Sequence, residues 1–211
     1  MKFRQISAFL IISLTAFFYF NCDDAGVVKP DDQQYCISGT ISNWTSGEKT
    51  LHAYLRNSSG ASFSFATCPV DAGGNFNLCL PSTVPDSALY ASDSIFFIGC
   101  DSGNVVFNPS NVRGTEISSF RIKSGDTTIA WLRRNNYDTL YPGAFSVMYI
   151  YTTINVNVTG TKFCNFDTLT FNGSALSPWT KVVKHCTRVI GPGTSYHYDT
   201  NEPNGAVWEL Y

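Results

Sequence analysis

The chain has 211 residues and a formal net charge of −2, with 14 lysines and arginines against 16 aspartates and glutamates. This mildly acidic chain has no basic cluster, and nucleic-acid binding needs concentrated positive charge. We therefore expect no nucleic-acid partner. Aromatic residues make up 15% of the chain and charged residues only 14%. Such a composition favours extracellular β-structure, because aromatic and β-branched side chains suit a half-buried pleated surface.

The first 21 residues predict an export signal. They begin with the basic residues Lys2 and Arg4 and continue as an apolar run from Ala8 to Phe20. A basic start followed by an apolar stretch of this length is typical of a secretory signal peptide, and the stretch is too short to span a bilayer. Residues 1–21 are therefore the predicted signal peptide.

The apolar run ends in Asn21-Cys22-Asp23-Asp24, a lone cysteine followed at once by acid. This arrangement resembles the export signal of bacterial lipoproteins. The resemblance implies that the sulfur of Cys22 carries lipid and that Cys22 is the first residue of the mature chain. The alternative is an ordinary secreted protein, but the general signal peptidase requires small residues before the cut, and no such pair follows the run. We therefore expect Cys22 to be the lipid anchor.

Residues 22–34 are polar, contain Gly and Pro and show no periodicity, so they predict a flexible tether between the anchor and the fold. From Tyr35 onward, short alternating runs separated by turn residues predict β-strands. The predicted runs are Cys36–Ser42, Thr50–Arg56, Ser62–Thr67, Asn75–Leu80, Ser94–Cys100, Val105–Asn108, Thr115–Lys123, Thr127–Arg133, Phe145–Thr161, Asp167–Phe171, Lys181–Val189, Ser195–Asp199 and Ala206–Tyr211.

No window of the chain shows a sustained period of 3.6, so we expect no helix longer than about two turns after the signal. The predicted fold class is all-β: an antiparallel β-sandwich of transthyretin-like or immunoglobulin-like kind, stapled by disulfides. We expect two packed β-sandwich units, one at residues 35–124 and a second β-rich domain at residues 125–211.

The chain has seven cysteines. Because disulfides use cysteines in pairs, at least one of the seven must have another role in a secreted protein. If Cys22 carries lipid, six remain to form disulfides in an oxidising compartment. These six are Cys36, Cys68, Cys79, Cys100, Cys164 and Cys186.

Six cysteines allow 15 pairings, and local spacing favours one bridge. Cys68 and Cys79 lie symmetrically about Gly73-Gly74, so a hairpin that turns there would place them opposite each other. Among the other four, Cys164 and Cys186 flank a second predicted hairpin, while Cys36 and Cys100 remain by elimination. The pairing of these four is left open.

Residues 36–81 carry motifs of a known module. Ile37-Ser-Gly-Thr-Ile-Ser opens the segment, and Val70-Asp-Ala-Gly-Gly-Asn-Phe-Asn-Leu-Cys-Leu-Pro closes it. Together they resemble the carboxypeptidase-regulatory-like or transthyretin-like module, which places Phe76, Leu78 and Leu80 on the inward face of one strand. The C-terminal tail, from Ser177 onward, is similar to that of bacterial lipoproteins that begin with the same module. The resemblance implies fold and location, and no activity.

No combination of residues predicts catalysis, a metal site or a cofactor. The three histidines are far apart in sequence, and neither a G-x-S-x-G nor an H-E-x-x-H motif is present. Trp44, Tyr196 and Tyr198 are candidate ligand-contact residues, because they fall in or beside predicted loops and aromatic rings can stack on sugars. Trp179 and Trp208 end apolar strands and are predicted to lie in the core.

These patterns together predict a non-catalytic, lipid-anchored protein of the bacterial cell envelope, in the periplasm or at the outer-membrane surface. We expect it to act as a structural or protein-interaction module. The alternative is a glycan-binding surface lipoprotein that uses exposed aromatic residues. A solvent-facing row of aromatic side chains on one sheet would favour the alternative. The expected partners are the membrane, through the anchor, and an envelope protein or glycan.

Overall fold

A computed structural model describes residues 34–92, 100, 102–191 and 193–211. The predicted anchor Cys22, the signal peptide and most of the tether lie outside these residues. The described strands are β1 Tyr35–Thr40, β2 Lys49–Arg56, β3 Ser62–Val70, β4 Asn75–Leu80, β5 Tyr90–Ala91, β6 Ser102–Asn108, β7 Arg113–Glu116, β8 Ser119–Ser124, β9 Thr127–Asn135, β10 Phe145–Thr152, β11 Val156–Cys164, β12 Asp167–Ala175, β13 Trp179–Ile190, β14 Gly193–Asp199 and β15 Val207–Leu210.

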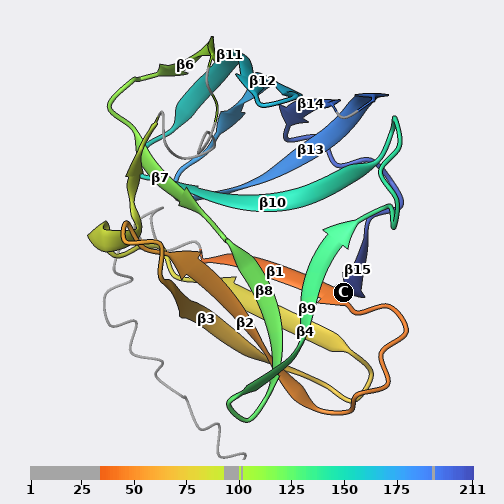
Figure 1. Ribbon diagram of the computed structural model, residues 1–211. Helices are drawn as coiled ribbons and strands as arrows, with labels where there is room; N and C mark the ends of the chain where they lie inside the picture. Colours follow the sequence, from red (N-terminus) through yellow and green to blue (C-terminus); the bar gives the residue numbers. More distant parts are fainter. Residues whose placement is uncertain (1–33, 93–99, 101, 192) are drawn as a thin grey trace, which may run out of the picture. The chain divides into compact units, whose positions relative to one another are not determined.

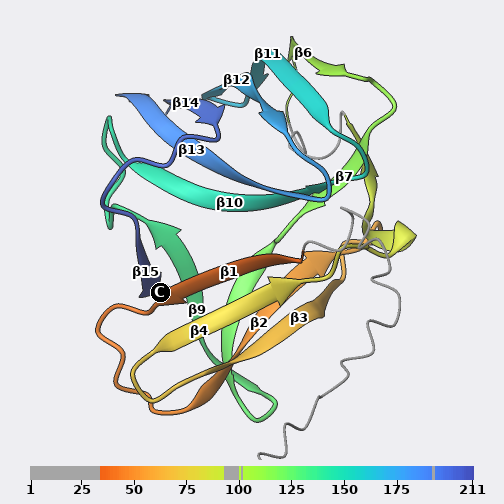
Figure 2. The same ribbon diagram turned by 180° about the vertical axis from the view of Figure 1, so that it is seen from behind.

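Seven of these strands form a ring. Their order is β1-β4-β3-β2-β8-β9, and β15 pairs with the far side of β9. The ring is closed by a parallel bridge between Ile41, just after β1, and Trp208 on β15, with a hydrogen bond of 2.8 Å from the amide of Ser42 to the carbonyl of Trp208. Figure 2 shows β1 and β4 side by side in the lower part of the molecule, with β15 beyond the end of β1.

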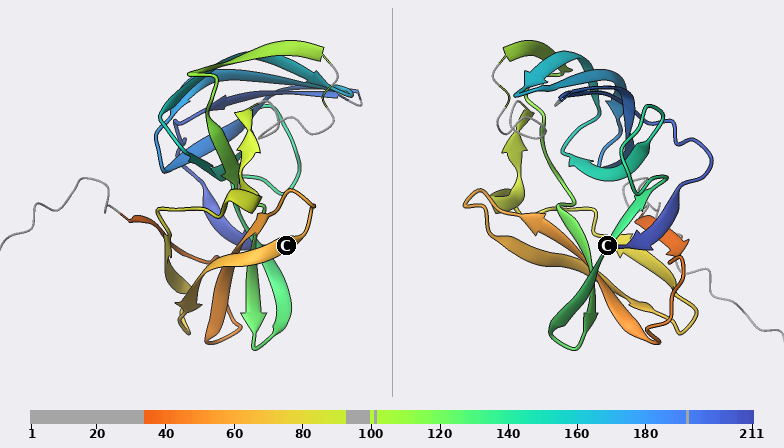
Figure 3. Two further views of the ribbon diagram at one scale, coloured as in Figure 1. Left: turned by 90° about the vertical axis from the view of Figure 1, so that its left-hand side faces the viewer. Right: turned by 45° about the vertical axis from the view of Figure 1, so that its right-hand side comes forward.

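The remaining long strands form a curved continuation of the same sheet, in the order β10-β13-β14-β12-β11-β6. Figures 1 and 3 show how strongly this part curls. All of its pairs are antiparallel except β12 with β14, which is parallel. β10 joins it to the ring, because Ser146 on β10 pairs with Asn135 on β9.

Two apolar cores follow from this arrangement. Leu51, Leu78 and Ile122 lie fully buried in the core inside the ring, and the odd-numbered side chains of β10 from Phe145 to Tyr151 pack onto the same core. Val158, Leu169, Phe171 and Tyr198 belong to the second core, within the curl. Because both faces of β10 are covered, its sequence FSVMYIYT is nearly continuously apolar.

The all-β, antiparallel-dominated fold class is confirmed, and the helical structure of the described residues is 3₁₀, at Asp86–Ala88 and at Ser92. None of these residues belongs to a helix long and apolar enough to cross a membrane. Residues 33–211 form one compact unit. Leu132 contributes to the first core and Phe107 to the second. The cores thus draw on both predicted halves, whose boundary at residues 124 and 125 stays a prediction.

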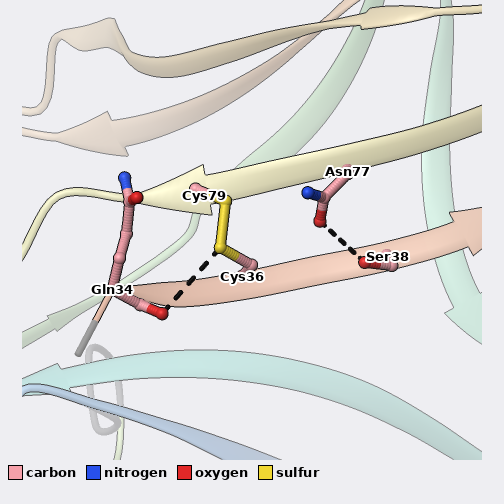
Figure 4. The surroundings of a disulfide bond; sticks show 5 residues. All are labelled: Gln34, Cys36, Ser38, Asn77 and Cys79. Atoms are coloured by element: carbon pink, nitrogen blue, oxygen red, sulfur yellow. Dashed lines mark hydrogen bonds between the residues drawn. A yellow bond between two sulfur atoms is a disulfide. The ribbon is translucent and has the colours of Figure 1, made fainter. Parts of the chain in front are cut away.

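The predicted Cys68–Cys79 bridge is wrong. Cys79 is bonded to Cys36, which lies directly opposite it on β1 (Figure 4), and Cys68 is a free, buried thiol. The cause is a shift of one residue in the hairpin register. Val70 pairs with Phe76, so the turn is centred on Gly73 and not between Gly73 and Gly74. Cys68 therefore points into the core, while Cys79 points to the outer face of the same sheet.

The pairing of the other four cysteines, left open from the sequence, differs from the association of Cys164 with Cys186 and of Cys36 with Cys100. Cys164 ends β11 and is bonded to Cys100, which lies just before β6. β6 is the neighbour of β11, whereas β12 and β14 separate β11 from the strand that carries Cys186. Cys186 is a second free and buried thiol. Two disulfides are therefore present among the described residues, where three were expected.

Candidate functional site

The most distinctive surface of the described residues is the outer face of β2, β8, β9 and β15. On each strand, side chains that face the core alternate with side chains that face outward; on β2 the outward-facing Tyr54 is only 9% exposed, and Arg121 lies over its ring. On β8, Phe120 and Ile122 are buried while Arg121 and Lys123 face outward. The outward side chains of the four strands define a surface that we call the ladder face: His52, Tyr54, Arg121, Lys123, Ile129, Trp131, Arg133, Glu209 and Tyr211.

Stacked aromatic and arginine side chains run across the ladder face. The register brings them together, because Arg121 pairs with Trp131 across the β8–β9 hairpin and Trp131 exchanges backbone hydrogen bonds with Tyr211. The Arg121 guanidinium carbon lies 3.9 Å from the ring centroid of Tyr54 and 4.8 Å from that of Trp131. The rings of Trp131 and Tyr211 are 6.2 Å apart, and Arg133 stacks on Tyr211 at 5.0 Å. Such cation–π contacts hold the side chains in place.

The ladder face is open to solvent although it is aromatic. Trp131 is 41% exposed, Tyr211 60% and Ile129 45%. A monomeric protein rarely exposes a contiguous cluster of large apolar side chains, and where it does the cluster commonly marks an interaction site. The ladder face is therefore the candidate functional site.

Charge on the ladder face is uneven. Arg133 is neutralised by Glu209, whose Oε1 lies 2.8 Å from its Nε, and by Asp138 at 3.7 Å. By contrast, no carboxylate of the described residues forms an ion pair with Arg121 or Lys123. Positive charge without a partner is thus concentrated on β8.

His52 lies beside these cations. Burial, and then the positive charge of Lys123, lower the pKa of its imidazole, which keeps the ring neutral at neutral pH. Its Nδ1 and the hydroxyl of Ser64 are 2.9 Å apart. His52 therefore adds hydrogen-bonding capacity to the ladder face and no charge.

The predicted ligand-contact residues lie elsewhere and are not brought together. Trp44 is half-buried: its indole N–H donates to the carbonyl of Gly47 at 3.1 Å, and its side chain lies against Gly74. Tyr198 is buried in the second core, stacked on Phe171 with centroids 4.4 Å apart, so its ring is not available for a ligand. Tyr196 is partly buried and packs against the same core.

The two tryptophans predicted to be core residues are confirmed as such. Trp179 and Trp208 are each only 3% exposed. The indole N–H of Trp179 donates to the carbonyl of Pro81 at 2.8 Å, and the ring of Trp208 packs edge-on against Phe76 and Phe120.

The fold does bring together two histidines that are 12 positions apart in the sequence. His185 on β13 pairs directly with His197 on β14, and both reach the carboxylate of Asp199, at 3.2 Å and 3.5 Å. Asp199 also accepts the amide N–H of Asn201. Within the described residues, no group of three or more His, Cys, Asp and Glu side chains is arranged to hold a metal ion. The cluster links two strands.

Two cavities of the described residues give no further candidate for chemistry. The apolar cavity in the second core, lined by residues such as Ile150, Val158 and Phe171, holds about 40 Å³, far less than the several hundred Å³ of a typical small-molecule site. An open groove at one end of the ring, between Lys49, Asp71 and Lys123, is larger at about 770 Å³. Asp71 is already used there, because its Oδ1 accepts the amide N–H groups of Gly73 and Asn75, each at 2.8 Å.

Comparison with known proteins adds no assignment: no family model, no curated protein and no solved structure matches this chain.

Proposed function

We propose that this chain is a non-catalytic, lipid-anchored protein of the bacterial cell envelope that acts as an interaction module. Its contact surface is the ladder face, and its anchor is Cys22. The single observation that carries the proposal is the exposed cluster of Trp131, Tyr211 and Ile129, interleaved with Arg121. Large aromatic side chains and arginine are the residue types that dominate binding energy at interfaces.

Other features support the location. The two disulfides are consistent with an oxidising compartment outside the cytoplasm. The apolar run before Cys22 and the acid after it resemble a lipoprotein export signal. A lipid group on Cys22, followed by a polar tether that ends near residue 34, would hold the ladder face close to a membrane while leaving it free to meet a partner.

A sedimentation experiment tests the proposal. The Cys22→Ser variant releases the chain from its anchor, so any remaining association with isolated cell envelopes must come from the folded part. We expect this soluble protein to sediment with envelopes, and we expect Trp131→Ala together with Tyr211→Ala to abolish the association. Phe166→Ala is the matched control, because Phe166 is 73% exposed and lies outside the ladder face. Equal sedimentation of all three proteins would refute the assignment of the surface.

The exposed ladder also favours a second candidate function, glycan binding. The aromatic side chains of the ladder face lie on one sheet, face solvent and include two large rings, those of Trp131 and Tyr211. Aromatic rings of this kind provide flat apolar surfaces for sugar rings. The residues differ from Trp44, Tyr196 and Tyr198, but the kind of surface is the one that the glycan-binding alternative requires. Replacement of the envelopes by purified glycans in the same experiment separates this function from protein binding.

A further inference from the structure

We infer that the ladder face binds an acidic polysaccharide, whose sugar rings pack on Trp131 and Tyr211 while its carboxylates pair with Arg121 and Lys123. This inference deepens the glycan-binding candidate and rests on the proposed function, since it takes the ladder face to be the contact surface. Two properties of the ladder face support the inference: its side chains are held in place, and its charge suits a carboxylate. The net charge of the whole chain supports it as well.

The aromatic side chains are held in place before any ligand arrives. Arg121 packs between Tyr54 and Trp131, its Nε donates to the hydroxyl of Ser119 at 3.1 Å, and Arg133 packs on Tyr211. Binding therefore requires little further ordering of these side chains, which removes a main cost of association. Trp131 and Tyr211 nevertheless stay exposed, and a polymer lying across β9 and β15 would contact both.

The charge on the ladder face matches a carboxylate. A guanidinium presents a planar fork of N–H donors that fits a carboxylate with two parallel hydrogen bonds. Arg121 has no such partner among the described residues, and Lys123 points to the same side of β8 two residues further on. Arg133 is already paired with Glu209. A ligand whose negative charges are spaced along an otherwise uncharged chain satisfies Arg121 and Lys123 and leaves the Arg133–Glu209 pair intact.

Single-stranded nucleic acid is the other polymer that combines stacking with negative charge. It carries a charge on every nucleotide, and its binding needs an extended basic groove. The ladder face offers two unpaired cations, on a chain whose net charge is −2. The spaced carboxylates of a polysaccharide suit this surface better, and nucleic acid is an outcome that the experiment can return.

The test measures binding of the full chain, freed from its anchor by Cys22→Ser, to partly methyl-esterified polygalacturonate, whose free carboxylates are spaced along the chain, and to the same polymer after complete methyl esterification. The two polymers share their rings and differ in charge. We expect the acidic form to bind, the ester to bind at least about tenfold more weakly, and added salt to weaken only the acidic form. Arg121→Gln should reduce affinity for the acidic form by about tenfold or more, and Trp131→Ala should reduce affinity for both polymers.

Controls keep the result interpretable. Arg188→Gln removes an exposed arginine of β13, outside the ladder face, and should change nothing. Lys123→Gln serves if Arg121→Gln unfolds the chain, because Lys123 makes no stacking contact with a ring of the ladder face.

The remaining outcomes refute the inference in distinguishable ways. Equal binding of the two polymers, insensitive to Arg121→Gln, refutes the acidic ligand and leaves the ladder face as a glycan site. Tighter binding of oligo-dT than of polygalacturonate assigns the ladder face to nucleic acid. Absence of binding to polygalacturonate overturns the inference, while envelope sedimentation still reports separately on the proposed function.

Discussion

Removal of the Cys36–Cys79 disulfide should destabilise the protein strongly. The bond joins directly opposed positions on β1 and β4 and spans 43 residues of sequence. In the loop-closure model, a cross-link around a loop of this length removes enough entropy from the unfolded chain to contribute about 4 kcal/mol at 25 °C. Cys36 is exposed and Cys79 only partly buried. Replacing both by serine therefore leaves no large apolar cavity to add to the loss.

The double variant Cys36→Ser with Cys79→Ser should thus lose about 4 kcal/mol of unfolding free energy, measured by urea denaturation without reductant. Cys68→Ser does not serve as a control for the double variant, because the Cys68 thiol lies in the core and its replacement would change the core packing. Titration of free thiols in the unfolded, unreduced chain with Cys22→Ser should find two per molecule, Cys68 and Cys186. An unchanged free energy in the double variant, or a peptide map that joins Cys68 to Cys79, would refute the register on which this reasoning depends.

Three further predictions follow from buried groups and from the anchor. Burial raises the pKa of Glu116 to about 7, so its carboxyl is neutral in the folded state below that pH. The free energy of unfolding should therefore fall as the pH rises from about 4.5 to 7, by up to about 3 kcal/mol. Glu116→Gln should remove this fall, as measured by chemical denaturation at pH 5 and pH 8. Gly39→Ala should cost about 1–3 kcal/mol in thermal unfolding, because a methyl group there would collide with the indole of Trp208 beside the bridge that closes the ring. In a chain whose ladder face is disabled by Trp131→Ala and Tyr211→Ala, Cys22→Ser should move the protein from the membrane to the soluble fraction, and normal processing with retention in the membrane would contradict the lipoprotein proposal.

Period-2 patterning was sufficient for the fold class and for most strands of the ring, although the predicted run Thr115–Lys123 merges β7 with β8. The inward positions Phe76, Leu78 and Leu80 are buried as predicted, because alternation fixes which side chains share a face once a strand exists. Alternation does not show where a strand ends. The predicted run of residues 145–161 is two strands, β10 and β11, separated at residues 153–155.

The register of the hairpin and the pairing of strands far apart in the sequence could not be predicted from the sequence. The Gly73-Gly74 turn was located, but a shift of one residue in the hairpin register reverses the face on which Cys79 lies and changes its partner. The ladder face was missed for a related reason. Trp131 and Tyr211 are 80 positions apart and meet only because β15 pairs with β9. Arg121 and Trp131 flank the Gly125 turn, but the pairing next to the turn, Ser124 with Thr127, would place Arg121 opposite Ala130; Arg121 meets Trp131 only because the register shifts by one residue between Ile122 and Lys123.

The central claim is that the ladder face contacts a component of the cell envelope. Photocrosslinking in living cells tests it most directly, with a photoreactive amino acid in place of Ile129, which is 45% exposed within the ladder face. The control carries the same group in place of Phe166. The account predicts adducts in the envelope fraction from position 129 and few from position 166. Equal adducts from both positions, or none from position 129, would contradict it.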